Sequence, residues 1–180
     1  RLDIVDSEDK TNIINTSWHD EKSTAPLIIS AVEPEFDGKT KRTINSWVSV
    51  GSNYATITEP TNPITNLVMD NPYKISIDWK NQFYIDVTSP YGKVEGGGWY
   101  DEGDTVVASI DTQIYDTGLA GTRLIFDGWT GDEVSSGMNI QIPVDAPKSL
   151  EGNWKKQFLL TVNSDHGIPN GAGWYDEGTL

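Results

Sequence analysis

The stretch WKNQFYIDVTSPYGKVEGGGWYDEGDT, residues 79–105, returns 75 residues later as WKKQFLLTVNSDHGIPNGAGWYDEGTL, residues 154–180. Fourteen of these 27 positions are identical without a gap. Self-similarity at a fixed spacing is the signature of a repeat architecture, in which each copy is one small supersecondary unit. The repeat therefore decides the fold, and it predicts several similar modules in a row.

The same frame extends towards the N-terminus with a few insertions, and it contains every tryptophan of the chain. The seven tryptophans occupy three repeated slots: Trp18, Trp99 and Trp174 in the first, Trp47 and Trp129 in the second, and Trp79 and Trp154 in the third. A repeat copies the parts that make its module fold. We therefore expect these side chains to serve as core or turn scaffold.

The repeat frame also sets the expected domain boundaries. We predict a divergent β-repeat module over residues 1–78, a complete module over 79–153, and the truncated start of a third module over 154–180. The first module departs most from the pattern, because Lys22 replaces the glycine of the D-E-G turn. We expect the third module to continue in the natural protein, since the match does not decay towards its last residues.

Within the complete module, apolar residues alternate with polar ones, which is typical of half-buried β-strands. The residues that this alternation turns towards the core are Phe83, Ile85, Val87, Leu124, Phe126, Ile140 and Ile142. Pro143 favours an edge position for its strand or the end of strand pairing, because proline lacks the N–H that a central strand needs. Residues 111–122 are polar and contain glycine, so we expect a loop there. The predicted class is all-β. If residues 111–122 instead form a helix packed on the core, the module is β-grasp-like.

The order of these blocks resembles the divergent internalin-type B-repeat. A strand is followed by G-G-G-W-Y-D-E-G at 96–103, by R-L-I-F-D-G-W-T-G-D at 123–132, and by a closing N-W-K-K-Q-F at 153–158. The resemblance implies a tandem β-repeat of archaeal or bacterial cell-surface and surface-layer proteins, and hence an extracellular location at the cell envelope. The family supplies no catalytic residues to carry over.

Composition excludes several classes of function. The formal net charge of -14 repels nucleic acid and anionic membranes, so we expect neither as a partner. The chain has no cysteine, which removes disulfides, zinc-thiolate sites and thiol nucleophiles. No apolar run approaches the roughly 20 residues of a membrane-spanning helix, so we expect no direct membrane insertion in this segment. The two histidines, His19 and His166, stand where other copies have tyrosine, which argues against a hydrolytic triad.

Three kinds of candidate site remain. The turn carboxylates Asp101, Glu102 and Asp104 could hold calcium, because hard cations favour clustered carboxylates, although aspartate also stabilises turns by bonding to the backbone. Tyr100 and Tyr175 are candidates for ligand stacking against a sugar, if the neighbouring first-slot tryptophans face inward. Asn15 begins the sequon Asn15-Thr16-Ser17, a glycosylation site for a surface protein.

These observations favour a non-enzymatic extracellular structural protein, whose repeats act in spacing, lattice formation or adhesion. Its expected partners are other copies of itself, envelope components or glycans, and it needs no cofactor unless calcium binds. The alternative is a carbohydrate- or ligand-binding accessory module of a larger secreted enzyme such as a protease.

Overall fold

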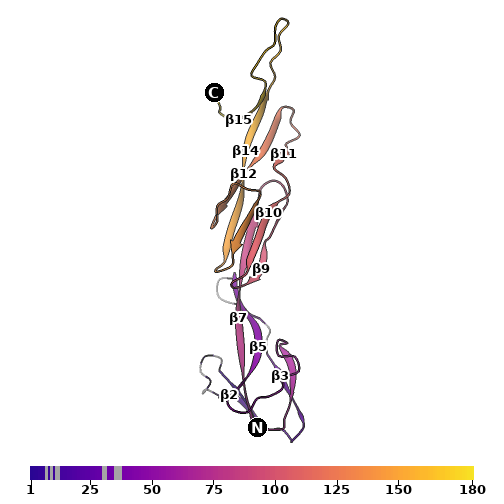
Figure 1. Ribbon diagram of the computed structural model, residues 1–180, viewed down its shortest axis with the longest axis vertical. Helices are drawn as coiled ribbons and strands as arrows, with labels where there is room; N and C mark the ends of the chain where they lie inside the picture. Colours follow the sequence, from indigo (N-terminus) through magenta and orange to yellow (C-terminus); the bar gives the residue numbers. More distant parts are fainter. Residues whose placement is uncertain (7, 9, 11–12, 30–31, 35–37) are drawn as a thin grey trace. The chain divides into compact units, whose positions relative to one another are not determined.

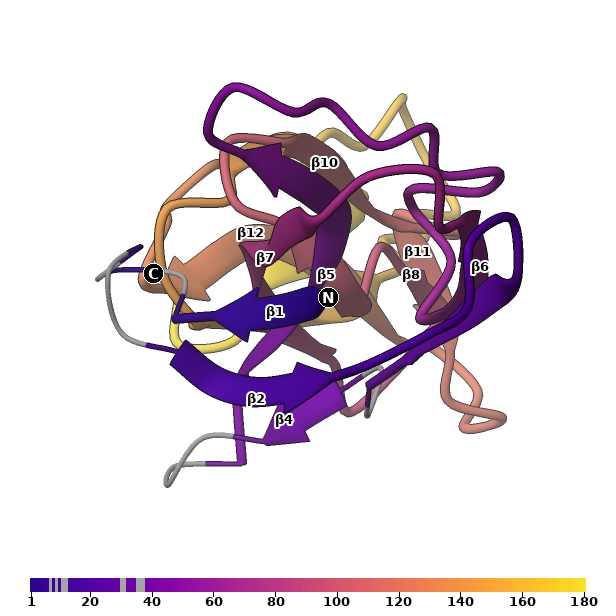
Figure 2. The same cartoon turned by 90° about the horizontal axis from the view of Figure 1, so that it is seen from below.

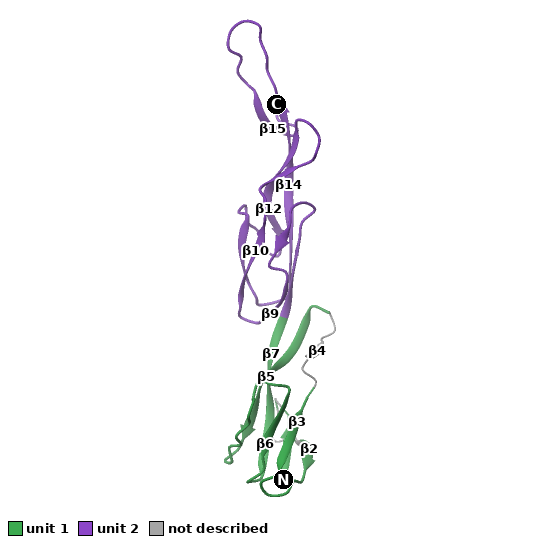
Figure 3. Cartoon of the chain, turned by 90° about the vertical axis from the view of Figure 1, so that its right-hand side faces the viewer, with its two compact units in different colours: residues 1–82 green, residues 83–180 purple. Residues whose placement is uncertain are grey.

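The computed structural model describes residues 1–6, 8, 10, 13–29, 32–34 and 38–180, and these residues form strands, turns and loops without any helix. The predicted all-β class is confirmed. The β-grasp variant requires a helix packed on the sheet, and the described residues supply none. The chain divides into two compact units, residues 1–82 and 83–180 (Figures 1 and 3). Each unit is described by itself below.

Unit 1 contains two β-sheets. The larger sheet has the order β2-β1-β7-β5-β4, and the smaller pairs β3 with β6. Figure 2 shows β1 and β2 side by side, and their pairing is antiparallel, whereas β1 and β7 run parallel. The strands are β1 (Leu2–Val5), β2 (Ile13–Ser17), β3 (Thr24–Ile28), β4 (Val32–Pro34), β5 (Thr40–Val50), β6 (Ile64–Val68) and β7 (Tyr73–Thr88).

Unit 2 repeats this plan. Its larger sheet has the order β9-β7-β14-β12-β11, with β15 on the second half of β14, and its smaller sheet has the order β13-β10-β8. Strand β7 thus begins in unit 1 and ends in unit 2. The remaining strands are β8 (Val94–Glu95), β9 (Gly98–Asp101), β10 (Thr105–Ile110), β11 (Ile114–Asp116), β12 (Thr122–Gly131), β13 (Asn139–Pro143), β14 (Lys148–Leu160) and β15 (Gly173–Asp176).

The core of unit 2 lies between its two sheets and contains the residues that the alternation selected. Ile85, Leu124, Phe126, Ile140 and Ile142 are buried, and Phe83 and Val87 pack against them half-buried. This prediction is confirmed. Strand β13, which ends at Pro143, lies at a sheet edge as expected. The prediction of a loop at 111–122 is partly wrong, because strand β11 lies within these residues. It pairs with β12, where Ile114 lies opposite Ile125.

The tryptophans divide by slot. The second-slot residues Trp47 and Trp129 are buried, and the third-slot residues Trp79 and Trp154 pack half-buried against the core of their unit. The first-slot residues do not belong to either core: Trp18 is 78% exposed, and Trp99 and Trp174 are half-buried outside the core clusters. The second- and third-slot tryptophans thus follow the core alternative of the prediction, and the first-slot tryptophans lie beside the repeated turn instead.

Backbone hydrogen bonds outside the strands recur at equivalent positions in the two units. Several bonds in unit 1 have a counterpart of similar length in unit 2, so the two units share this part of their backbone design. The pairs are Lys22 N to Met69 O (2.7 Å) with Gly103 N to Val144 O (2.8 Å), Ile29 N to Pro63 O (3.0 Å) with Ile110 N to Met138 O (3.2 Å), and Trp47 N to Pro60 O with Trp129 N to Ser135 O (both 2.7 Å).

Strand β14 has two roles within unit 2. Its first half, from Lys148, pairs in parallel with the end of β7, and its second half, up to Leu160, pairs antiparallel with β15. Along both halves it pairs with β12. Figure 1 shows this strand running unbroken from the body of unit 2 to the β15 hairpin. The residues predicted as the start of a third module, 154–180, thus share a strand with the module before them.

Candidate functional site

The W-x-D-E turn is the most repeated local feature of the chain, and it has the same geometry in all three copies. The carbonyl of the aspartate accepts the N–H of the third residue after it at 3.1 Å each time; the pairs are Ser23 to Asp20, Asp104 to Asp101, and Thr179 to Asp176. The residue before each donor has positive φ: 62° at Lys22, 89° at Gly103 and 83° at Gly178. This φ is costly for a residue with a Cβ, which explains the two glycines.

One carboxylate of this turn, that of Asp104, stabilises the turn itself. Asp104 Oδ2 accepts the N–H of Asp101 at 3.2 Å. Asp101 is half-buried, whereas Glu102 and Asp104 are exposed. Among the described residues, no three acidic or histidine side chains converge in an arrangement that could hold a metal ion. The geometry supports the turn role of these aspartates, and calcium binding at Asp101, Glu102 and Asp104 stays a prediction.

The two tyrosines considered for ligand stacking occupy equivalent positions but differ in their surroundings. Each hydroxyl donates to a carbonyl four residues earlier, Tyr100 to Gly96 at 3.1 Å and Tyr175 to Gly171 at 2.8 Å. Tyr100 packs against the core of unit 2, whereas Tyr175 is exposed. The premise that first-slot tryptophans face inward is wrong here, because Trp99 packs edge-on against Tyr84, away from the core.

A polar cluster that the repeat alone did not reveal lies where β12 meets the β14–β15 hairpin. The guanidinium of Arg123 lies 4.2 Å from the ring centroid of Trp174, a cation–π contact. Arg123 Nε also donates to Gln157 Oε1 at 2.8 Å, and Gln157 Nε2 donates to Asp176 Oδ1 at 2.7 Å. A hollow of about 530 Å³ opens beside Arg123 and Trp174, with Leu119 on its wall. The cluster fixes the hairpin to the preceding module.

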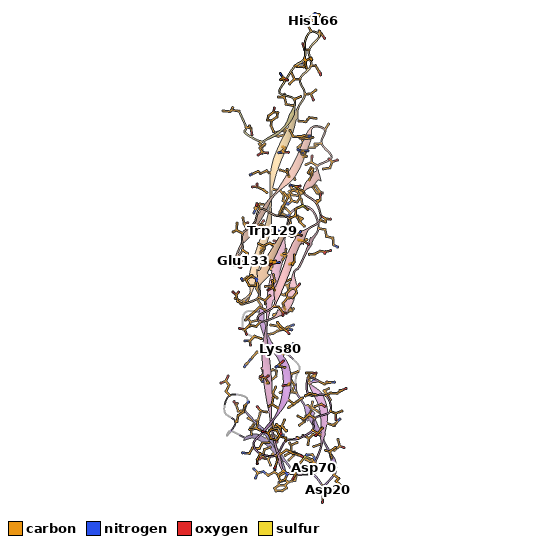
Figure 4. The ribbon with its side chains drawn as sticks, viewed as in Figure 1. Asp20, Asp70, Lys80, Trp129, Glu133 and His166 are labelled. Carbon is orange, nitrogen blue, oxygen red and sulfur yellow. The ribbon has the colours of Figure 1, made fainter. Side chains whose placement is uncertain are left out.

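A second unpredicted cluster surrounds the buried Lys148, whose partner Glu133 is marked in Figure 4. The Lys148 ammonium donates to Glu133 Oε1 at 2.7 Å and lies 3.1 Å from Asp145 Oδ1. The hydrogen bond to Glu133, with that to Asp145, raises the pKa of Lys148 above its ordinary value of 10.5. The amine therefore stays protonated at neutral pH and acts as a hydrogen-bond donor, not as a nucleophile.

The same slot in unit 1 holds a tyrosine hydrogen-bonded to an aspartate. The Tyr73 hydroxyl donates to Asp70, and this bond raises the pKa of Tyr73 and lowers that of Asp70. Asp70 and Tyr73 precede Asp145 and Lys148 by 75 residues each, the spacing of the sequence repeat. An aspartate three residues before the polar partner is thus common to both units, while the partner differs.

The histidines do not form a catalytic constellation among the described residues. His19 Nε2 lies 2.9 Å from Ser17 Oγ, but no described carboxylate holds its other ring nitrogen, as a hydrolytic triad would require. His166 lies exposed at the tip of the loop between β14 and β15 (Figure 4), and its N–H donates to Ser164 Oγ. Both residues are bonded within short local turns.

Asn15, the predicted glycosylation site, lies in the edge strand β2 with its side chain exposed. Thr16, the middle residue of the sequon, donates to the buried carboxylate of Asp3 at 2.8 Å. This bond and one from Arg1 lower the pKa of Asp3, although burial opposes them as the largest single influence. Glycosylation at Asn15 stays a prediction that this exposure allows.

Comparisons with models of known protein families, with curated proteins and with solved structures give no match to this chain. The internalin-type resemblance therefore rests on the motifs alone. No helix among the described residues is long and apolar enough to span a membrane.

Proposed function

We propose that this chain is a non-enzymatic segment of a tandem β-module array on a cell surface, where it acts in spacing, lattice formation or adhesion. The observation that carries the proposal is the unbroken strand β14, which closes one module and opens the next hairpin. A shared strand replaces a flexible linker, so tension along the chain is borne by the ladder of hydrogen bonds to β12. Such a connection suits a spacer.

The two units support the same proposal. They repeat one set of backbone bonds while their side chains diverge, as in the pairs Tyr73 with Lys148 and Lys22 with Gly103. A repeat protein selected for shape retains the backbone design of its module while individual side chains change. The net charge of -14 adds an acidic surface that attracts cations and excludes anions near an envelope.

The experiment that tests this proposal is immunogold labelling of intact cells of the source organism with an antibody raised against residues 1–180. We expect dense labelling of the outer surface before permeabilisation, with self-assembly or adhesion lost when the gene is deleted. Labelling that appears only after permeabilisation would contradict the proposal. A matched antibody against a cytosolic protein serves as the control for cell integrity.

One observation favours a second function, that of a glycan-binding accessory module. Trp18 in unit 1 exposes 78% of its surface, and an exposed indole offers a face on which a sugar ring can stack. Trp174, by contrast, has one ring face occupied by Arg123. Binding to immobilised glycans that Trp18→Ala abolishes, and that Trp174→Ala leaves unchanged, would support this second function.

A further inference from the structure

The β14–β15 hairpin of unit 2 exposes an apolar face, whereas the equivalent face where β7 pairs with β9 is buried in the core of the same unit. Leu160 is 49% exposed, whereas Ile85, its equivalent in the repeat, is fully buried. Phe158 and Tyr175 lie directly opposite each other across the two strands and are exposed on the same face as Leu160. Their equivalents Phe83 and Tyr100 pack against the core. A hollow of about 510 Å³ lies over this face.

The other face of the same hairpin contacts the preceding module. Leu159 lies opposite Trp174, and Arg123 covers the Trp174 ring. The hairpin is therefore fixed in place from one side by the preceding module, with its apolar side turned outward. Pairing with β12 and the contact between Arg123 and Trp174 hold the exposed face of this hairpin in a defined orientation.

The two units show what covers this face. In unit 1 and unit 2 it is covered by the smaller sheet, which pairs β3 with β6 and β10 with β13 in the same register, Thr24 opposite Val68 and Thr105 opposite Pro143. Buried side chains of that sheet, such as Val106, Ala108 and Ile142 in unit 2, fill the core. The covering element is thus the same in both copies.

A backbone group points to the same occupant. In both units the positive-φ residue of the turn donates its N–H to the residue that follows the smaller sheet, Lys22 to Met69 and Gly103 to Val144. The equivalent N–H of Gly178 donates to no carbonyl of the described residues. This donor lies beside the exposed face and matches a carbonyl that the smaller sheet of a module supplies.

We infer that the face formed by Phe158, Leu160 and Tyr175 is the docking surface for a polypeptide with the strand pattern of residues 104–153. A second folded copy of the chain is a poorer occupant, because its β10 and β13 already cover its own core. The inference deepens the proposed array and rests on it. Docking in solution and location on the cell are separate measurements, so either proposal can fail while the other holds.

The test titrates the full ¹⁵N-labelled chain with a synthetic polypeptide of residues 104–153 and follows the amides by NMR. We expect saturable one-to-one binding that shifts the Gly178 amide and protects it from exchange. Leu160→Asp should weaken binding roughly tenfold or more, since it places a charge against an apolar core. Leu159→Asp is the matched control, equally exposed but on the opposite face, and should change binding less than about twofold.

If the free polypeptide of residues 104–153 aggregates, a variant that carries these residues in the same chain provides the test. In this variant residues 104–153 follow Gly178 directly, as they follow Gly103 in unit 2, and we expect a protected Gly178 amide and buried Leu160. An exchanging Gly178 amide in this chain would overturn the inference. So would equal weakening by Leu160→Asp and Leu159→Asp, absence of saturable binding, or self-association of the unmodified chain that Leu160→Asp abolishes.

Discussion

Unit 1 and unit 2 solve the same folding problem with different residues. At the turn after the first hairpin, unit 2 places Gly103 at a φ of 89°, while unit 1 holds Lys22 at 62°, the one non-glycine residue of positive φ among those described. Both N–H groups donate to equivalent carbonyls at 2.7–2.8 Å. The repeat therefore retains its hydrogen-bond framework, and this framework can hold a strained residue.

The largest loss of stability should come from mutating the second-slot tryptophans, which occupy equivalent positions in the two units. Trp129 is 1% exposed and donates from Nε1 to Met138 O, and Trp47 is 4% exposed and donates to Asn62 O. Truncation of a buried tryptophan to alanine costs about 3–5 kcal/mol. We expect Trp129→Ala and Trp47→Ala each to lower the free energy of unfolding of its unit by about that amount, measured by urea denaturation.

A control for these variants is Trp18→Ala, whose indole is exposed and should contribute little to stability. If Trp47→Ala destabilises as little as Trp18→Ala, unit 1 does not use its second slot as unit 2 does.

The next effect concerns a position where the units differ in backbone. Gly128 has a φ of 120°, and a Cβ there would lie 2.4 Å from Ser135 O, while its equivalent Ser46 is not a positive-φ residue. Gly128→Ser should therefore destabilise unit 2 by about 2–3 kcal/mol through strain. The reverse change, Ser46→Gly, should cost unit 1 only about 0.5–1 kcal/mol in backbone entropy. Equal effects in denaturation would contradict the comparison.

A pH series separates the two polar pairs. The pKa of Lys148 is raised, so its stabilisation is complete below pH 10.5 and is lost as the pH rises through the folded-state pKa. The hydrogen bond from Lys148 lowers the pKa of Asp145, whose contribution is complete above pH 3.8 and is lost in more acidic solution. Lys148→Met should remove the Lys148 contribution at alkaline pH and weaken that of Asp145 at acidic pH, measured as denaturation midpoints against pH. Lys155, whose pKa is raised by its hydrogen bond with Asp127, should keep its own alkaline contribution in this variant. Lys93→Met, at an exposed ion pair, is the control and should leave these contributions intact.

The stability of unit 1 should also fall at alkaline pH, which gives its plot of denaturation midpoint against pH an alkaline limb. The Asp70 carboxylate raises the pKa of Tyr73 above its ordinary value of 10.0, so the stabilisation by the hydroxyl is complete below pH 10 and is lost as the tyrosine ionises. Tyr73→Phe should abolish this limb in unit 1 and leave that of Lys148 in unit 2. An unchanged alkaline limb in Tyr73→Phe would show that another group titrates there.

The smallest effect should come from the strained turn itself. Lys22→Gly relieves the positive-φ strain and should stabilise unit 1 by about 0.5–1 kcal/mol, because glycine adopts this conformation without a steric penalty. The exposed position of Lys22 leaves no packing to lose. A decrease in the denaturation midpoint would mean that the Lys22 side chain has a role beyond the turn. Glu21→Gly, one residue earlier in the same turn, is the matched control and should not stabilise.

Periodicity predicted the core strands because burial on one face imposes alternation, as at Ile85 and Ile142. It did not predict which face Trp99 occupies, since neighbouring residues on a strand face opposite ways and only the register with β7 decides between them. The β-branched Ile114 was a local signal for β11 that the polar surroundings of 111–122 obscured. The contacts of Lys148 with Glu133 and of Arg123 with Trp174 join distant residues, and no local pattern carries them.

The most direct test of the shared framework is amide hydrogen exchange by NMR at the equivalent bonds of the two units. The amides to compare are those of Lys22 with Gly103, Ile29 with Ile110, Trp47 with Trp129, and Met69 with Val144. We predict that both members of every pair are protected, because each donates to an equivalent backbone carbonyl. Protection in unit 2 together with free exchange of the matching amides in unit 1 would contradict the account.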